Sequence, residues 1–73
     1  MAIRVFVNAM AVDVDEGSTA IECVRWWRSE EADAVLAGAR LITDSRGLAI
    51  PSDSIAHPGS IYRTVQSRAA ARD

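Results

Sequence analysis

The 73-residue chain has almost none of the residues that cross-link small domains. It contains one cysteine, Cys23, and one histidine, His57. No internal disulfide can form, and these two side chains cannot complete a zinc site, so we expect neither a metal nor a cofactor. The length predicts one domain, near the lower size limit at which a hydrophobic core alone maintains a fold. Stability must therefore come from packing, from self-association or from an unidentified protein partner.

The sequence also lacks an excess of positive charge and a long apolar run. The formal net charge is −2 and the pI is about 5.2, so no overall electrostatic attraction to nucleic acid or anionic lipid is expected. No apolar run reaches the roughly 18 residues of a membrane span, and an alternating pattern starts at Ile3 in place of a signal peptide. We therefore expect a cytoplasmic protein with no membrane or nucleic-acid partner.

A helix is the clearest element that the sequence contains. Thr19 followed by Glu22 has the spacing of a capping box, which predicts a helix start within residues 17–28. At 100° per residue, Ala20, Val24 and Trp27 fall on one stripe, which we expect to be buried. The adjacent Trp26 then points toward the polar side.

Alternating apolar residues predict strands on both sides of this helix. In the last strand, we expect Ile61 and Val65 to point inward and Tyr62 to point outward. Residues 68–73 are expected to form a flexible tail after a domain over residues 1–67. The expected strands are 3–8, 10–14, 40–43, 48–50 and 60–66, with a short second helix over 32–37 capped by Ser29.

This order resembles that of the ubiquitin-like β-grasp proteins, and is nearest to the small sulfur carriers of thiamine and molybdopterin synthesis. The resemblance lies in the first strand at 3–8, the helix entry at 15–19 and the turn Pro58-Gly59 before the last strand. It implies an α+β fold in which a mixed four- to five-stranded sheet packs on one main helix.

The end of the chain separates two functional hypotheses. In the carriers, the last strand leads to a Gly-Gly tail that an activating enzyme adenylates before it becomes a thiocarboxylate. Here residues 67–73 read Ser-Arg-Ala-Ala-Ala-Arg-Asp, without Gly-Gly. We therefore expect a non-catalytic ubiquitin-like protein that acts as an interaction module or small subunit. The alternative is a sulfur-carrier or conjugation-type protein with an atypical or processed C-terminus, whose partner would be an activating enzyme.

No catalytic constellation can be assembled from these residues, so an enzyme is not expected. Cys23 borders the buried stripe, where a thiol is usually inert, and His57 has no neighbouring carboxylate or nucleophile. The acidic residues over 13–16 could collect a hard cation, but such a pattern on a strand usually marks its solvated face.

Three aromatic residues are the candidates for protein interaction. Trp26 offers a large apolar area on a polar helix face, unless the tail or residues 29–37 cover it. Phe6 and Tyr62 are expected side by side on the sheet face away from the helix, either as an interaction patch or as a simple cross-strand pair. A nucleic-acid surface formed by residues 25–28 with Arg63, Arg68 and Arg72 is a weaker hypothesis, because the chain is acidic.

Overall fold

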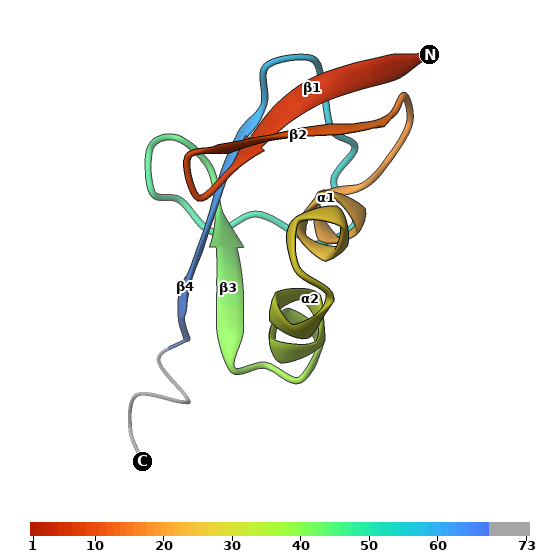
Figure 1. The fold of residues 1–73 in the computed structure, drawn as a ribbon. Coiled ribbons are helices and arrows are strands. Elements are labelled where there is room, and N and C mark those ends of the chain that lie inside the picture. Colours follow the sequence, from red (N-terminus) through yellow and green to blue (C-terminus); the bar gives the residue numbers. More distant parts are fainter. Residues whose placement is uncertain (68–73) are drawn as a thin grey trace.

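Four strands form one mixed sheet in the order β2-β1-β4-β3 (Figure 1). The computed structural model describes residues 1–67, and the expected tail over 68–73 lies outside the described residues. In chain order the elements are β1 (Ala2–Val7), β2 (Met10–Asp15), α1 (Ala20–Trp27), α2 (Ser29–Leu36), β3 (Arg40–Thr43) and β4 (Ile61–Gln66). β1 runs antiparallel to β2 and parallel to β4, and β3 runs antiparallel to β4. The predicted α+β class and mixed sheet are therefore confirmed.

The expectation of one main helix is wrong, because α1 and α2 have 8 residues each. The capping box forms as predicted: the N–H of Thr19 donates to Glu22 Oε1 at 2.9 Å, and the N–H of Glu22 donates to Thr19 Oγ1 at 3.4 Å. α1 ends where Arg28 adopts an extended conformation (φ −155°, ψ 121°), and α2 begins at the next residue. Ser29 is thus the first residue of α2 and not its cap.

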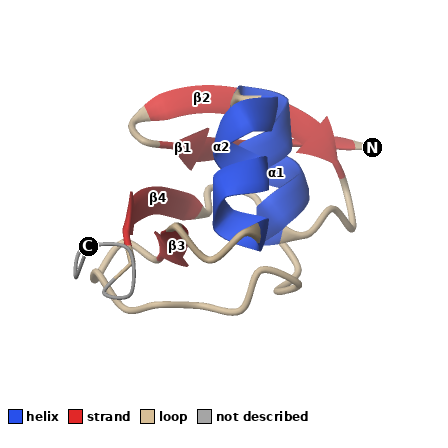
Figure 2. Cartoon of the chain, turned by 90° about the horizontal axis from the view of Figure 1, so that it is seen from below, coloured by secondary structure: helices blue, strands red, loops and turns tan. Residues whose placement is uncertain are grey.

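Neither helix could cross a membrane, since both are too short for a bilayer span. They lie next to each other on one side of the sheet, as Figures 1 and 2 show.

The predicted strand over 48–50 is reduced to a bridge between Thr43 and Ala49 and a hydrogen bond from the N–H of Ile50 to the carbonyl of Ile42.

A tight turn at Asn8 and Ala9 joins β1 to β2. Both residues have positive φ values, 51° and 70°. A type I′ turn, one of the favoured two-residue connections of β-hairpins, requires positive φ at both positions. Asparagine tolerates this conformation, whereas alanine is strained in it because of its Cβ. The hairpin forms without glycine because the pairing of six residues on each strand fixes its ends.

The core lies between the helices and the inner face of the sheet. Val5, Val7 and Ile42 are buried on that face against Cys23 and Val24 of α1. The other buried apolar residues are Ile3, Val14, Ala20, Ala32, Ala56 and Tyr62. The predicted stripe is confirmed for Ala20 and Val24, and Trp27 packs partly buried beside them.

The predicted register of the last strand is wrong. Tyr62 is only 4% exposed and lies in the core, whereas Ile61 and Val65 are 44% and 39% exposed. The parallel pairing with β1 sets this arrangement, because Tyr62 lies opposite the buried Val7. Side chains alternate along a strand, so an inward Tyr62 turns Ile61 and Val65 outward.

Candidate functional site

Four apolar side chains gather on the sheet face that carries no helix. We call Phe6, Leu41, Ile61 and Val65 the outer patch. Phe6 lies in register with Ile61 across β1 and β4, and Leu41 lies in register with Val65 across β3 and β4. Leu41 is 42% exposed, which is close to the values for Ile61 and Val65, while Phe6 is partly buried. The patch therefore crosses three adjacent strands.

The outer patch has charged and polar neighbours. Arg63 stands between Ile61 and Val65 on the same face and lines a surface hollow together with Phe6, Ala9 and Ile61. The guanidinium of Arg63 makes no ion pair with any residue of the described part of the chain. An apolar centre beside an unpaired charge is typical of the surface of a protein interface.

A cross-strand ion pair borders the other end of this face. Arg4 Nε donates to Asp13 Oδ1 at 3.0 Å, and Arg4 Nη2 donates to Asp13 Oδ2 at 3.4 Å. These hydrogen bonds, reinforced by the positive charge of Arg4, lower the pKa of Asp13. The pair keeps both charges on the outer face of β1 and β2.

The predicted pairing of Phe6 with Tyr62 is wrong, because the two side chains lie on opposite faces of the sheet. The outward neighbour of Phe6 is Ile61. Burial raises the pKa of the Tyr62 phenol, as expected for a hydroxyl inside the core. The sequence does contain a signal for the correct face: Arg63 shares a strand face with Ile61 and Val65, and a lone arginine on a strand marks the solvent side.

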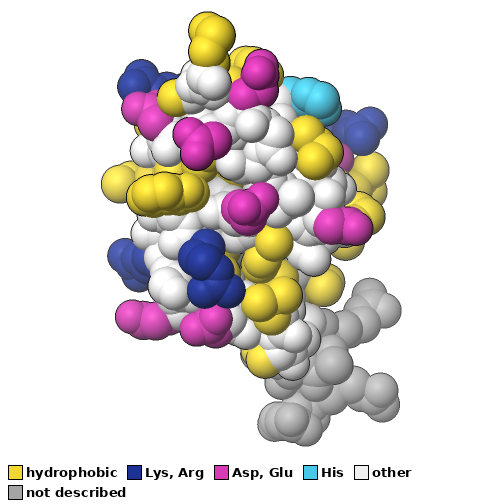
Figure 3. All heavy atoms as spheres, turned by 90° about the vertical axis from the view of Figure 1, so that its right-hand side faces the viewer, with side chains coloured by type: hydrophobic (Ala, Val, Ile, Leu, Met, Phe, Trp, Pro, Cys, Tyr) yellow, Lys and Arg dark blue, Asp and Glu magenta, His cyan; other side chains and the backbone are white. Residues whose placement is uncertain are grey.

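Trp26 is 69% exposed on α1, so residues 29–37 do not cover it. It lines a hollow with Glu22 and Arg25, and both of these neighbours are held in place. Glu22 is fixed by the capping box, where the Thr19 N–H and then the Thr19 hydroxyl lower its pKa. Arg25 Nη1 reaches Asp33 Oδ1 at 3.3 Å. On this helix side, hydrophobic side chains lie in separate groups among charged ones (Figure 3).

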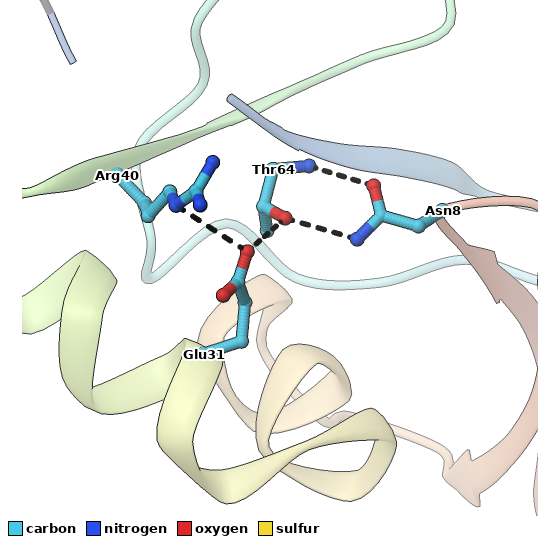
Figure 4. A network of polar contacts seen from close by, with 4 residues as sticks. All are labelled: Asn8, Glu31, Arg40 and Thr64. Carbon is cyan, nitrogen blue, oxygen red and sulfur yellow. Dashed lines mark hydrogen bonds and ion pairs between the residues drawn. The ribbon is translucent and has the colours of Figure 1, made fainter. Parts of the chain in front are cut away.

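A polar cluster that was not predicted from the sequence ties α2 to the sheet (Figure 4). The Asn8 amide accepts the Thr64 N–H at 3.0 Å and donates to Thr64 Oγ1 at 2.9 Å. Thr64 Oγ1 in turn donates to Glu31 Oε2 at 2.5 Å, and Arg40 Nε lies 3.8 Å from the same oxygen. We call these four residues the polar clamp.

Asn8 extends the parallel pairing of β1 and β4 beyond its last residue pair. The Asn8 N–H donates to the Tyr62 carbonyl at 2.9 Å, which continues the ladder from β1. At the next step the backbone has already turned away, and the Asn8 side-chain oxygen accepts the Thr64 N–H in place of a backbone carbonyl. The contacts among residues 8, 31, 40 and 64 could not be predicted from the sequence pattern, because these residues are widely separated along the chain.

Within residues 1–67, no group of three or more acidic, histidine or cysteine side chains could hold a metal ion. Cys23 is buried. Burial, and to a lesser extent the negative charge of nearby Glu22, raises the pKa of its thiol, which favours the protonated, unreactive form. His57 is exposed in a loop. Comparison of the chain with family models, curated proteins and solved structures found no match.

Proposed function

We propose that this chain is a ubiquitin-like β-grasp protein that acts without catalysis, as an interaction module or small subunit. The arrangement of the strands supports the β-grasp assignment: the first and last strands are parallel neighbours in the middle of the sheet, and each is flanked by an antiparallel strand. Fold alone does not define function, so the functional part of the proposal depends on the surface.

The observation that carries the proposal is the outer patch. Its apolar side chains lie in register on neighbouring strands, and three of them remain 39%, 42% and 44% exposed. Apolar side chains grouped on one face mark interaction sites more often than scattered ones do. Such groups supply the anchors of protein interfaces, and Arg63 supplies a charge for orientation. The partner would therefore present an apolar surface with an acidic group opposite Arg63.

Trp26 is the competing surface, and a matched pair of variants separates the two. The tagged wild-type protein, Ile61→Ser/Val65→Ser and Trp26→Ser would each be used to purify partners from the organism that encodes the chain. We expect the partner to bind wild type and Trp26→Ser and to be lost from the double variant. Far-ultraviolet circular dichroism and urea unfolding would establish that all three proteins are folded. Loss of the partner only from Trp26→Ser would move the interface to α1.

The sulfur-carrier alternative has its own test. The intact mass of the protein isolated from its native host would define its C-terminus and detect exchange of oxygen for sulfur. If the protein acts only as an interaction module or small subunit, we expect its C-terminus to carry no thiocarboxylate. A thiocarboxylate would contradict the proposed function and make an activating enzyme the partner to seek.

A further inference from the structure

The two edges of the sheet differ in how their backbone groups are paired. At the β3 edge, the N–H of Ile50 donates to the carbonyl of Ile42 at 2.9 Å, and Thr43 forms a bridge with Ala49. A returning segment of the chain therefore covers that edge. β2 forms the opposite edge, and among the described residues its only strand partner is β1.

The backbone groups of Ala11 and Asp13 point away from the sheet. Phe6 uses its N–H for the Ser60 carbonyl at 2.9 Å, so it faces β4 and does not bond to Ala11, its antiparallel partner. Likewise, the Arg4 carbonyl accepts the N–H of Gly59 at 2.8 Å, so the backbone of Arg4 faces β4 and is not bonded to the backbone of Asp13. In an antiparallel pair, residues that are not bonded to the partner strand turn their N–H and C=O groups to the other side. Within residues 1–67, these groups of Ala11 and Asp13 have no partner.

The side chains along this edge are acidic on one face and apolar on the other. Asp13, Asp15 and the adjacent Glu16 are exposed, and Arg4 is the one described cation that pairs with any of them. On the helix side of the same strand, Met10 is 59% exposed and Val12 is partly buried. An added strand would meet negative charge on the outer face and apolar surface on the inner face.

We propose that the β2 edge binds an extended segment of a partner protein in which basic side chains alternate with apolar ones. The segment would add a fifth strand by bonding to Ala11 and Asp13, as in other cases of strand addition. Its basic side chains would lie beside Asp13 and Asp15, and its apolar side chains beside Met10 and Val12. This site is separate from the outer patch and does not depend on it.

A second copy of this chain fits the edge poorly. Antiparallel pairing of β2 with itself about the middle of the strand brings the two Asp13 carboxylates close together. Like charges on neighbouring strands are destabilising, and acidic residues at an edge are a common protection against self-pairing. The same charges attract a basic strand, so they select the partner as well as preventing a homodimer.

The test is amide hydrogen exchange, measured by NMR on the folded protein with a synthetic peptide of alternating lysine and valine. We expect exchange of the Ala11 and Asp13 amides to slow by about tenfold or more at saturating peptide. The effect should weaken as salt is raised, because the attraction is between exposed charges. A peptide of alternating glutamate and valine should leave both amides unchanged.

Two variants make the result specific. Ala11→Pro removes the outward N–H without removing any bond to β1, and proline is tolerated at sheet edges, so this variant should fold but lose the protection. Ile61→Ser changes the outer patch and should keep the protection, which separates this proposal from the interface assigned to the outer patch. Equal protection by both peptides, persistence in folded Ala11→Pro, or no slowing of the two amides would overturn the proposal. So would slowing that depends on protein concentration without peptide.

Discussion

The two faces of the sheet use similar residues in different ways. On the inner face, Val5, Val7 and Tyr62 are buried against the helices. On the outer face, Ile61 and Val65 are more than a third exposed, although they are as hydrophobic as the inner residues. The inner face therefore accounts for the stability of the fold, and the outer face keeps apolar area that folding does not use. This difference is the basis for placing the interface on the outer face.

The comparison is tested most strongly by truncating neighbouring residues of β4. Tyr62→Ala should lower the free energy of unfolding by about 3–5 kcal/mol, because it removes a large buried side chain and leaves a cavity. Ile61→Ala, one residue away on the outer face, should cost less than about 1 kcal/mol. Urea unfolding measures both, and Tyr62→Phe keeps the ring if Tyr62→Ala does not fold. A larger loss for Ile61→Ala than for Tyr62→Ala would reverse our assignment of the faces.

The polar clamp provides the next largest expected effect on the inner face. Asn8→Gly removes both side-chain hydrogen bonds to Thr64 while keeping a residue that adopts positive φ easily. We expect a loss of about 1–3 kcal/mol in urea unfolding, because the Thr64 N–H is left without its acceptor. Arg46→Ala, at an exposed turn away from the clamp, is the control and should have little effect. An unchanged unfolding free energy for Asn8→Gly would show that the clamp contributes nothing.

The hairpin turn allows a change in the opposite direction. Ala9 has a φ of 70°, so Ala9→Gly should relieve the strain of a Cβ in this conformation and stabilise the protein by about 0.5–1 kcal/mol. Thermal unfolding checks this. Ala11→Gly, two residues further along in β2, lacks that strain to relieve and should be destabilising. If both glycine variants are destabilising, the turn is not the strained conformation described here.

The smallest expected effect is the pH dependence contributed by the cap of α1. Hydrogen bonds from Thr19 lower the pKa of Glu22 in the folded protein, so folding favours its ionised form. Its contribution is therefore complete above the unfolded pKa of about 4.3, and is lost as the pH falls through the lower, folded pKa. Urea unfolding at a series of pH values should show a shallower acid loss for Glu22→Gln than for wild type. Identical pH profiles would contradict this role.

Local patterns were sufficient to predict much of the fold. The capping box located the start of α1, and alternation located β1, β2 and β4 to within a residue or two. A second helix after α1 was also predicted, but its start was misplaced: Arg28, without a side-chain cap bond, is the N-cap of α2, and Ser29 is the first residue of that helix. The direction of Tyr62 depends on its pairing with Val7, a residue that is distant in the sequence.

The candidate surfaces were predicted less completely. The exposure of Trp26 followed from helical geometry, since its neighbour Trp27 belongs to the buried stripe. The outer patch was predicted through Phe6 but with the wrong neighbour. The polar clamp and the unpaired edge of β2 depend on contacts between distant segments, and no short sequence pattern specifies them.

Site-specific photo-crosslinking tests the central claim most directly. A photoreactive amino acid would replace Ile61 in the outer patch, Trp26 on α1 or Glu30 on α2, and each variant would be irradiated in cells of the native host. We predict a discrete adduct with a partner protein from position 61 and none from position 30. Adducts from position 26 alone, or equal adducts from positions 61 and 30, would contradict the assignment of the interface to the outer face of the sheet.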